Sequence, residues 1–178
     1  MGKLILFIAT SLDGYIARPD GGIDWLENMY NPDQIDHGYV SFIGTVEMLI
    51  MGRITYEKIR GMGIEWPYPG KRTYVLSSND KFGPSTPETY LCSESPASLT
   101  ARLKSECNGN IWLVGGGVTC SSFFTGQLVD EIILTIIPVI LGEGIPLFDR
   151  KSPFSSWKLI RSETFSSGAV SLHYRIQP

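Results

Sequence analysis

The chain has 178 residues, of which 43% are hydrophobic and 19% charged, and its formal net charge is −3. This composition is ordinary for a soluble globular protein, and the length predicts one domain, residues 1–178, with a substantial core. Non-specific nucleic-acid binding needs a basic face. The slight negative charge therefore argues against a nucleic-acid partner.

The spacing of the cysteines indicates the cellular location of the protein and whether it binds a metal. Cys92, Cys107 and Cys120 are widely spaced, and the two histidines lie far apart. This pattern predicts neither a disulfide framework nor a metal site, and it fits a reducing, cytoplasmic location. The N-terminal apolar run is too short for a signal peptide, and the run 132–141 is about half the roughly 20 residues of a membrane-spanning helix. We expect no membrane partner.

Apolar runs alternate with amphipathic stretches. We expect strands at 3–9, 48–51, 73–76, 111–114, 130–141, 157–163 and 170–176, the first of them fully buried. Helices are expected over 31–46, beginning at Asn31, from the segment "GRITYEKI" (52–59), and over 98–106 and 118–128. The first would have Asn31 as N-cap and an apolar face of Ile35, Tyr39, Phe42, Ile43 and Val46. Early alternation and a late hairpin predict an α/β sheet with antiparallel additions.

Glycine follows two of these strands, in "LIMGRITYE" (49–57) and "IWLVGGGVT" (111–119). In open α/β sheets, ligands bind at the carboxyl ends of strands, where helix N-termini present free N–H groups. Three successive glycines indicate either a tight turn with positive φ or the close approach of a phosphate. The dinucleotide fingerprint GxGxxG is not met, because Cys120 takes the third glycine position. The residues alone leave both interpretations open.

Five segments, in this order, carry a resemblance to a known family: "IATSLDGYIA" (8–17), "LIMGRITYE" (49–57), "YVLSS" (74–78), "LVGGGVT" (113–119) and "VDEIILTIIPVILGEGIPLF" (129–148). The chain resembles the dihydrofolate reductase-like superfamily, and most closely the C-terminal reductase domain of the bifunctional deaminase-reductase of riboflavin biosynthesis. The resemblance implies a three-layer α/β fold with a mixed, mostly parallel central sheet and a C-terminal antiparallel hairpin.

The same resemblance implies an NADPH-dependent oxidoreductase that acts on a small heterocyclic or carbonyl substrate, similar to 5-amino-6-(5-phosphoribosylamino)uracil reductase. A pterin reductase of the dihydrofolate reductase type, or a nucleotide-binding module without turnover, are the alternatives. Related reductases are commonly dimeric, and the segment 132–148 is more apolar than one sheet edge needs. We therefore expect a homodimer.

The resemblance also implies a cofactor site. Its residues would be Ala9, Thr10, Ile16, Gly52, Arg53, Thr55, Leu76, Ser77, Ser78, Val114, Gly115, Gly116, Gly117, Val118 and Thr119. Arg53 has a physical case of its own, because a guanidinium matches a phosphate with two parallel hydrogen bonds. At a strand's carboxyl end it could meet the 2′-phosphate of NADPH; a solvated arginine is the alternative.

Two residues are expected at the catalytic centre. Asp36 precedes Gly52 by sixteen residues, as a helix-borne carboxylate does in dihydrofolate reductases. On the expected helix it would lie at the edge of the apolar face, where a half-buried carboxyl with a raised pKa could deliver a proton. The alternative is a solvated acid in the first helical turn. Thr135 aligns with a strand threonine that lines the substrate cleft in that family, and an ordinary strand residue is its alternative.

Overall fold

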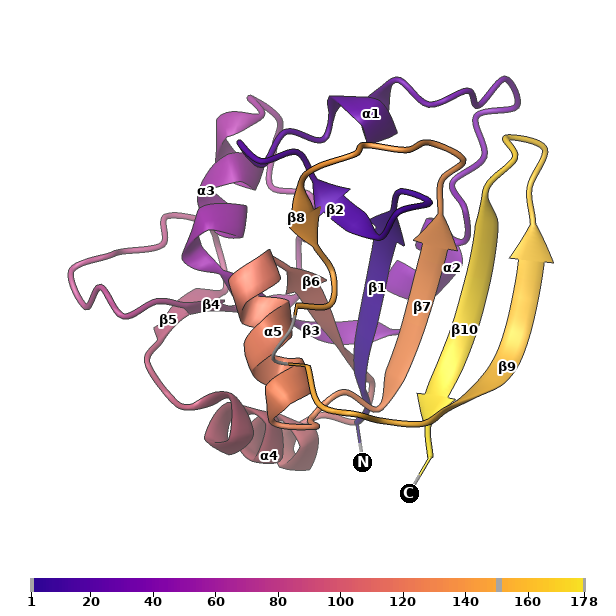
Figure 1. Cartoon of the computed structure of the whole chain (residues 1–178). Coiled ribbons are helices and arrows are strands. Elements are labelled where there is room, and N and C mark those ends of the chain that lie inside the picture. The colour runs from indigo at the N-terminus through magenta and orange to yellow at the C-terminus, as the bar shows by residue number, and fades with distance from the viewer. Residues whose placement is uncertain (1, 150–151, 178) are drawn as a thin grey trace.

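The computed structural model describes residues 2–149 and 152–177. Eight strands form one sheet in the order β5-β4-β3-β6-β1-β7-β10-β9, and β2 and β8 form a separate pair (Figure 1). The strands are β1 (Leu4–Thr10), β2 (Tyr15–Ala17), β3 (Val46–Gly52), β4 (Arg72–Leu76), β5 (Thr89–Cys92), β6 (Asn110–Gly115), β7 (Glu131–Ile136), β8 (Ile145–Pro146), β9 (Trp157–Thr164) and β10 (Val170–Ile176). The helices are α1 (Asp24–Glu27), α2 (Tyr39–Ile43), α3 (Arg53–Gly61), α4 (Pro96–Glu106) and α5 (Gly117–Thr125).

The sheet is mixed and mostly parallel. β1 lies at its centre and pairs in parallel with β6 and β7, whereas β10 is antiparallel to both β7 and β9. This arrangement confirms the expected fold class, including the C-terminal hairpin.

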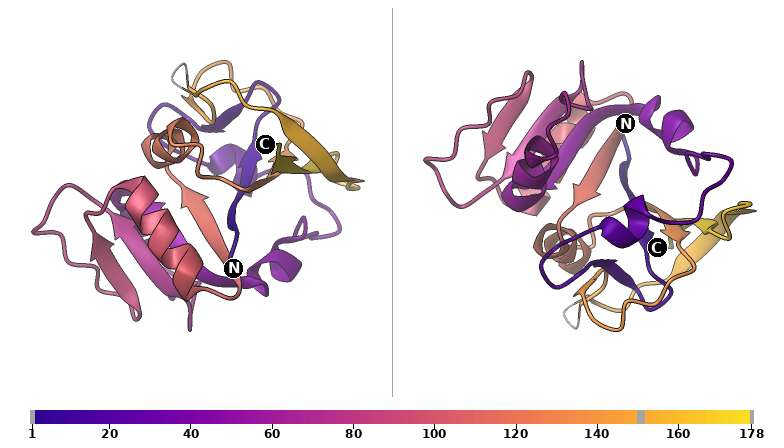
Figure 2. Two further views of the ribbon diagram at one scale, coloured as in Figure 1. Left: turned by 90° about the horizontal axis from the view of Figure 1, so that it is seen from below. Right: turned by 90° about the horizontal axis from the view of Figure 1, so that it is seen from above.

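Alternate residues of the strands build two cores, because successive side chains point to opposite faces of a sheet. Leu4 and Leu6 of β1 belong to the core that also holds residues of α4 and α5, including Leu103 and Phe123. Ile5 belongs to the core on the other face, which α2 and α3 supply. Figure 2, seen along the strands, shows α4 and α5 on one side of the sheet and α2 on the other.

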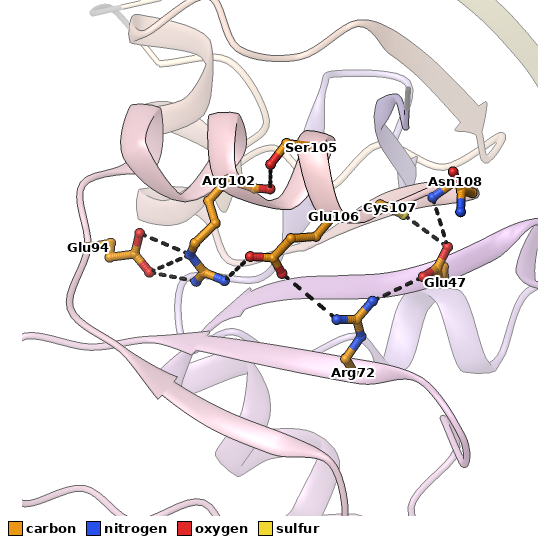
Figure 3. A network of polar contacts seen from close by, with 8 residues as sticks. All are labelled: Glu47, Arg72, Glu94, Arg102, Ser105, Glu106, Cys107 and Asn108. Atoms are coloured by element: carbon orange, nitrogen blue, oxygen red, sulfur yellow. Dashed lines mark hydrogen bonds and ion pairs between the residues drawn. The ribbon is translucent and has the colours of Figure 1, made fainter.

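A chain of alternating charges ties α4 to the start of the strands below it (Figure 3). Arg72 contacts Glu47 at 3.0 Å and Glu106 at 3.8 Å, and Arg102 contacts Glu106 at 3.4 Å and Glu94 at 2.6 Å. Each side chain is about one-third exposed, so each pair contributes little alone. Together they link α4 to the first residues of β3 and β4.

The helix expected from Asn31 is wrong. Residues 31–38 form turns, α2 comprises only Tyr39–Ile43, and Val46 begins β3. Gln34, His37 and Gly38 have φ of 51°, 52° and 86°, which a right-handed helix cannot contain.

Other boundaries also differ. The long strand expected over 130–141 ends at Ile136, and α1, β2, β5 and β8 were not expected. Most of the apolar residues in 132–148 are at least partly buried within the chain's own fold; Ile137 and Leu147 are 1% and 2% exposed. The apolar excess of this segment therefore does not by itself call for a partner subunit.

Candidate active site

Two helix N-termini meet at the carboxyl edge of the sheet. α3 follows β3 and α5 follows β6, and these two strands are neighbours with Met51 opposite Gly115. The N-cap residues are Gly52 and Gly116, and neither helix start has a side-chain cap, whereas Ser95 caps α4. The first-turn N–H groups and the positive dipole ends of both helices therefore face one region.

Each of these helices places a threonine against the N-cap glycine of the other. A Cβ atom on Gly52 would lie 2.5 Å from Thr119 Oγ1, and one on Gly116 would lie 2.8 Å from Thr55 Oγ1. Such distances exclude a side chain at either glycine without movement of the threonine. The two helix starts are thus packed closely enough to act on one ligand.

The fold itself requires glycine at the three successive positions 115–117. Gly115 and Gly116 have φ of 140° and 94°, which side chains rarely adopt. A Cβ on Gly117 would lie 2.6 Å from Ile145 Cγ2. The turn interpretation is confirmed, and the approach of a phosphate stays a prediction.

The predicted cofactor residues lie mainly at this edge. Gly52 pairs in register with Leu76, and Ser77 and Ser78 follow it. Val114 lies at the end of β6, Val118 is 87% exposed on the first turn of α5, and Ile16 comes from β2. Ala9 and Thr10 end β1. The structure brings these positions together, and their binding role stays a prediction.

Arg53 is the first residue of α3, and its side chain is 38% exposed. Its Nη1 donates to both carboxylate oxygens of Glu57, at 2.9 and 2.8 Å. The guanidinium therefore lies along the helix and is ion-paired rather than freely solvated.

The central strand is partly uncovered. Leu4, Ile5 and Leu6 are at most 3% exposed, but Phe7, Ile8 and Ala9 are partly exposed. The prediction of full burial therefore fails in the carboxyl half of β1. Because β1 runs parallel to β6, these partly exposed residues lie toward the same edge of the sheet as the helix N-termini.

A buried hydroxyl lies beside the partly exposed part of β1. Thr135 of β7 lies opposite Ala9 of β1 and is 4% exposed, yet its Oγ1 has no hydrogen-bond partner among the described residues. The indole N–H of Trp25, 6% exposed, is unpartnered in the same way. Buried polar groups without partners cost about 1–3 kcal/mol each and point to a missing ligand or water.

Aromatic rings gather around Phe7 of β1, a feature that the sequence did not reveal. Phe7 stacks on Phe42 with ring centroids 4.5 Å apart. The ring centroids of Tyr39 and Trp112 lie 6.2 and 6.3 Å from that of Phe7. In sequence these residues resemble ordinary core positions. The pairing of β1 with β6 and the packing of α2 against these strands bring them together.

Asp36 does not have the environment predicted for it. It lies in the turn before α2 and is exposed, and its carboxylate accepts hydrogen bonds from the backbone N–H groups of Val40 at 2.7 Å and Gly38 at 3.0 Å. These bonds lower the pKa of Asp36 below its usual value. The prediction of a half-buried carboxyl on a helix with a raised pKa is wrong. The turn leaves the carboxylate exposed to water, and its two backbone N–H groups stabilise the negative charge.

A pocket of about 340 Å³ lies elsewhere, lined by Arg72, Tyr74, Tyr90, Leu91, Cys92, Glu94 and Arg102. Both of its arginines are already paired with carboxylates. Among residues 2–149 and 152–177, no group of three His, Cys, Asp or Glu side chains could hold a metal ion. Within the same residues, no helix combines the length and apolar character needed to cross a bilayer.

Comparison with known proteins identifies the family. The model of the RibD C-terminal domain matches residues 2–171. The chain belongs to the RibD C-terminal domain family. The resemblance expected from the sequence, to the C-terminal domain of the deaminase-reductase of riboflavin biosynthesis, is confirmed.

Known proteins of similar length match nearly the whole chain. The uncharacterized protein YwjB of Bacillus subtilis is 40% identical over 172 residues, which cover 97% of each chain. A crystal structure from Shewanella sp. PV-4, assigned to riboflavin biosynthesis, is 34% identical with a TM-score of 0.89 and covers 99% of both chains. The dihydrofolate reductase of Enterococcus faecalis, solved with NADP(H), shares the fold at 18% identity and a TM-score of 0.68, covering 99% of this chain and 98% of that one.

Proposed function

We propose that this protein is an NADPH-dependent reductase of a small planar heterocycle, of the pyrimidine type that riboflavin biosynthesis requires. The observation that carries the proposal is the meeting of two uncapped helix N-termini at Gly52 and Gly116, beside the uncovered half of β1. A diphosphate fits such a site, because two positive helix ends can share its charge. Membership in a reductase family supports the same activity.

In this proposal, different residues at the edge would hold the two ends of the cofactor. The turn at Gly115–Gly117 and the start of α5 would hold the diphosphate and the nicotinamide end. Gly52, Arg53 and Thr55 would hold the adenosine end, with the Arg53 guanidinium at its 2′-phosphate and Ser77 and Ser78 beside it. When bound, NADPH supplies a hydride to the substrate.

The substrate would lie over Ala9, where Thr135 could form the hydrogen bond that its hydroxyl lacks. The aromatic group at Phe7 and Tyr39 favours a flat, ring-shaped substrate. Asp36 has no part as proton donor in this proposal, because its carboxylate is exposed and already accepts hydrogen bonds from the backbone N–H groups of Gly38 and Val40.

Turnover tests the proposal directly. The protein would be mixed with NADPH and, separately, with ribosylaminopyrimidine, dihydropterin and simple carbonyl substrates, and the loss of reduced-nicotinamide absorbance followed. We expect oxidation with the pyrimidine. Oxidation with the pterin alone would favour a dihydrofolate reductase-type activity, and binding without oxidation across the panel would favour a nucleotide-binding module.

We also propose a cytoplasmic homodimer. The location is supported by three free, buried cysteines. For the dimer, β9 is an eight-residue edge strand that exposes Leu159 and Ile160, at 48% and 42%, and such edges readily pair with another chain. Sedimentation should give twice the chain mass at micromolar concentration, and a monomer at that concentration would contradict the dimer.

A further inference from the structure

Glu57 forms an ion pair with Arg53, whose guanidinium would bind the 2′-phosphate of NADPH in the proposed function. Arg53 Nη1 binds both oxygens of Glu57, and the two side chains are 38% and 45% exposed. The pair joins the first and fifth residues of α3, one helical turn apart. A phosphate that approaches Arg53 therefore meets a carboxylate already in place.

Two physical consequences follow for a dianionic ligand. Arg53 must give up its ion pair with Glu57 or share its donors, and a second negative charge remains within a few ångströms of the phosphate. Ser77 and Ser78 offer only neutral donors from the neighbouring strand end. A free ribose hydroxyl, as in NADH, carries no charge and is almost indifferent to Glu57.

We propose that Glu57 is a specificity-determining residue that weakens binding of the 2′-phosphate and so limits the preference of this protein for NADPH over NADH. The inference rests on the proposed function, because it requires the adenosine end of the cofactor to lie at Arg53. Glu57 acts on cofactor choice through Arg53 and does not touch the reacting atoms.

The test is binding of NADPH and NADH to the wild type and to Glu57→Gln, measured by cofactor fluorescence and by the shift in thermal midpoint. We expect Glu57→Gln to tighten NADPH about three- to tenfold, the scale of one exposed ion pair plus one nearby charge, and to change NADH less than about twofold. The NADPH gain should shrink as salt rises, because solvent-exposed charges are screened.

Glu106→Gln is the matched control. Glu106 also ends an i,i+4 pair with an arginine, Arg102, on α4 and away from the candidate site. The Glu106→Gln substitution removes the same charge and should change neither the NADPH affinity nor the NADH affinity.

The outcomes separate the inference from the function on which it rests. Unchanged NADPH affinity in Glu57→Gln, or equal tightening of both cofactors, would overturn the role of Glu57 while leaving NADPH binding intact. A wild type that binds neither cofactor would overturn both the inference and the proposed function.

Discussion

Thr119 Oγ1 of α5 lies 2.5 Å from the point where a Cβ atom would stand on Gly52, the N-cap of α3. The two helices come from neighbouring strands, β3 and β6. The contact shows that the first turns of α3 and α5 pack closely against each other.

Gly52→Ala should lower the free energy of unfolding by about 1–3 kcal/mol, the usual cost of overpacking. Gly52 has φ of −76°, so alanine meets no backbone strain there. Thr119→Ala in the same chain should recover most of the loss, because the next atom, Thr119 Cβ, lies at an ordinary 3.7 Å. Denaturant unfolding of the two single variants and the double variant measures this coupling.

Strictly additive losses in that cycle would contradict the contact. Gly116 offers a contrast, since it meets Thr55 but has φ of 94°. Gly116→Ala should stay destabilised when Thr55 is also changed to alanine, because the backbone strain remains.

Thr135→Val should separate stability from activity. Valine has almost the same shape but no hydroxyl, so the unpartnered polar atom disappears and the free energy of unfolding should stay equal or rise by up to about 1 kcal/mol. If Thr135 binds the substrate, kcat/KM should fall about tenfold, the factor for one lost hydrogen bond. Unfolding curves and steady-state kinetics are the measurements.

Thr100→Val is the control for that substitution. Thr100 is equally buried, but its hydroxyl donates to the Pro96 carbonyl at 2.7 Å. It should lose about 1 kcal/mol of stability and keep full activity. Unchanged kcat/KM in Thr135→Val would remove Thr135 from the substrate site.

Strong local patterns predicted much of this fold. The glycine junctions and the helices that follow them appear in the structure as α3 and α5, and the C-terminal hairpin as β9 and β10. The segment "PDQIDHG" misled, because its proline and acid are typical of a helix start, whereas Gln34 and His37 adopt left-handed φ. The four-residue strand β5 lacks any periodic signal.

The sequence predicted the parts of the candidate site that depend on local backbone geometry. It did not predict the parts that depend on packing between distant segments. Glycine after a strand reports a helix N-terminus directly. The environment of Asp36 depends on the turn that encloses it, and the unpartnered hydroxyl of Thr135 depends on β1 and β10 beside it. No local pattern carries that information.

Asp36→Asn should act on structure rather than on chemistry. The carboxylate accepts backbone hydrogen bonds from Gly38 and Val40, and an amide can accept with only one oxygen. The exposed position limits the expected loss to about 0.5–1 kcal/mol. Turnover at pH 7 should fall less than about tenfold. Removal of a positioned proton donor usually lowers turnover by roughly 10²-fold or more.

The pH dependence of Asp36 has a definite sign. Its pKa is lower in the folded chain than in the unfolded one, so its contribution to stability is present above its ordinary pKa and is lost as the pH falls through the lowered value. The difference in unfolding free energy between wild type and Asp36→Asn should therefore shrink in acid. A drop in turnover of a hundredfold with unchanged stability would restore Asp36 as the proton donor.

Fluorescence titration of NADPH and NADH against the wild type and Arg53→Ala tests the central claim, that the cofactor lies across the two helix N-termini with its 2′-phosphate at Arg53. A charged hydrogen bond is worth roughly 1.5–3 kcal/mol, or about ten- to a hundredfold in affinity. We predict that Arg53→Ala loses NADPH affinity by about that factor and keeps its NADH affinity. Equal losses for the two cofactors, or no loss for NADPH, would contradict the account.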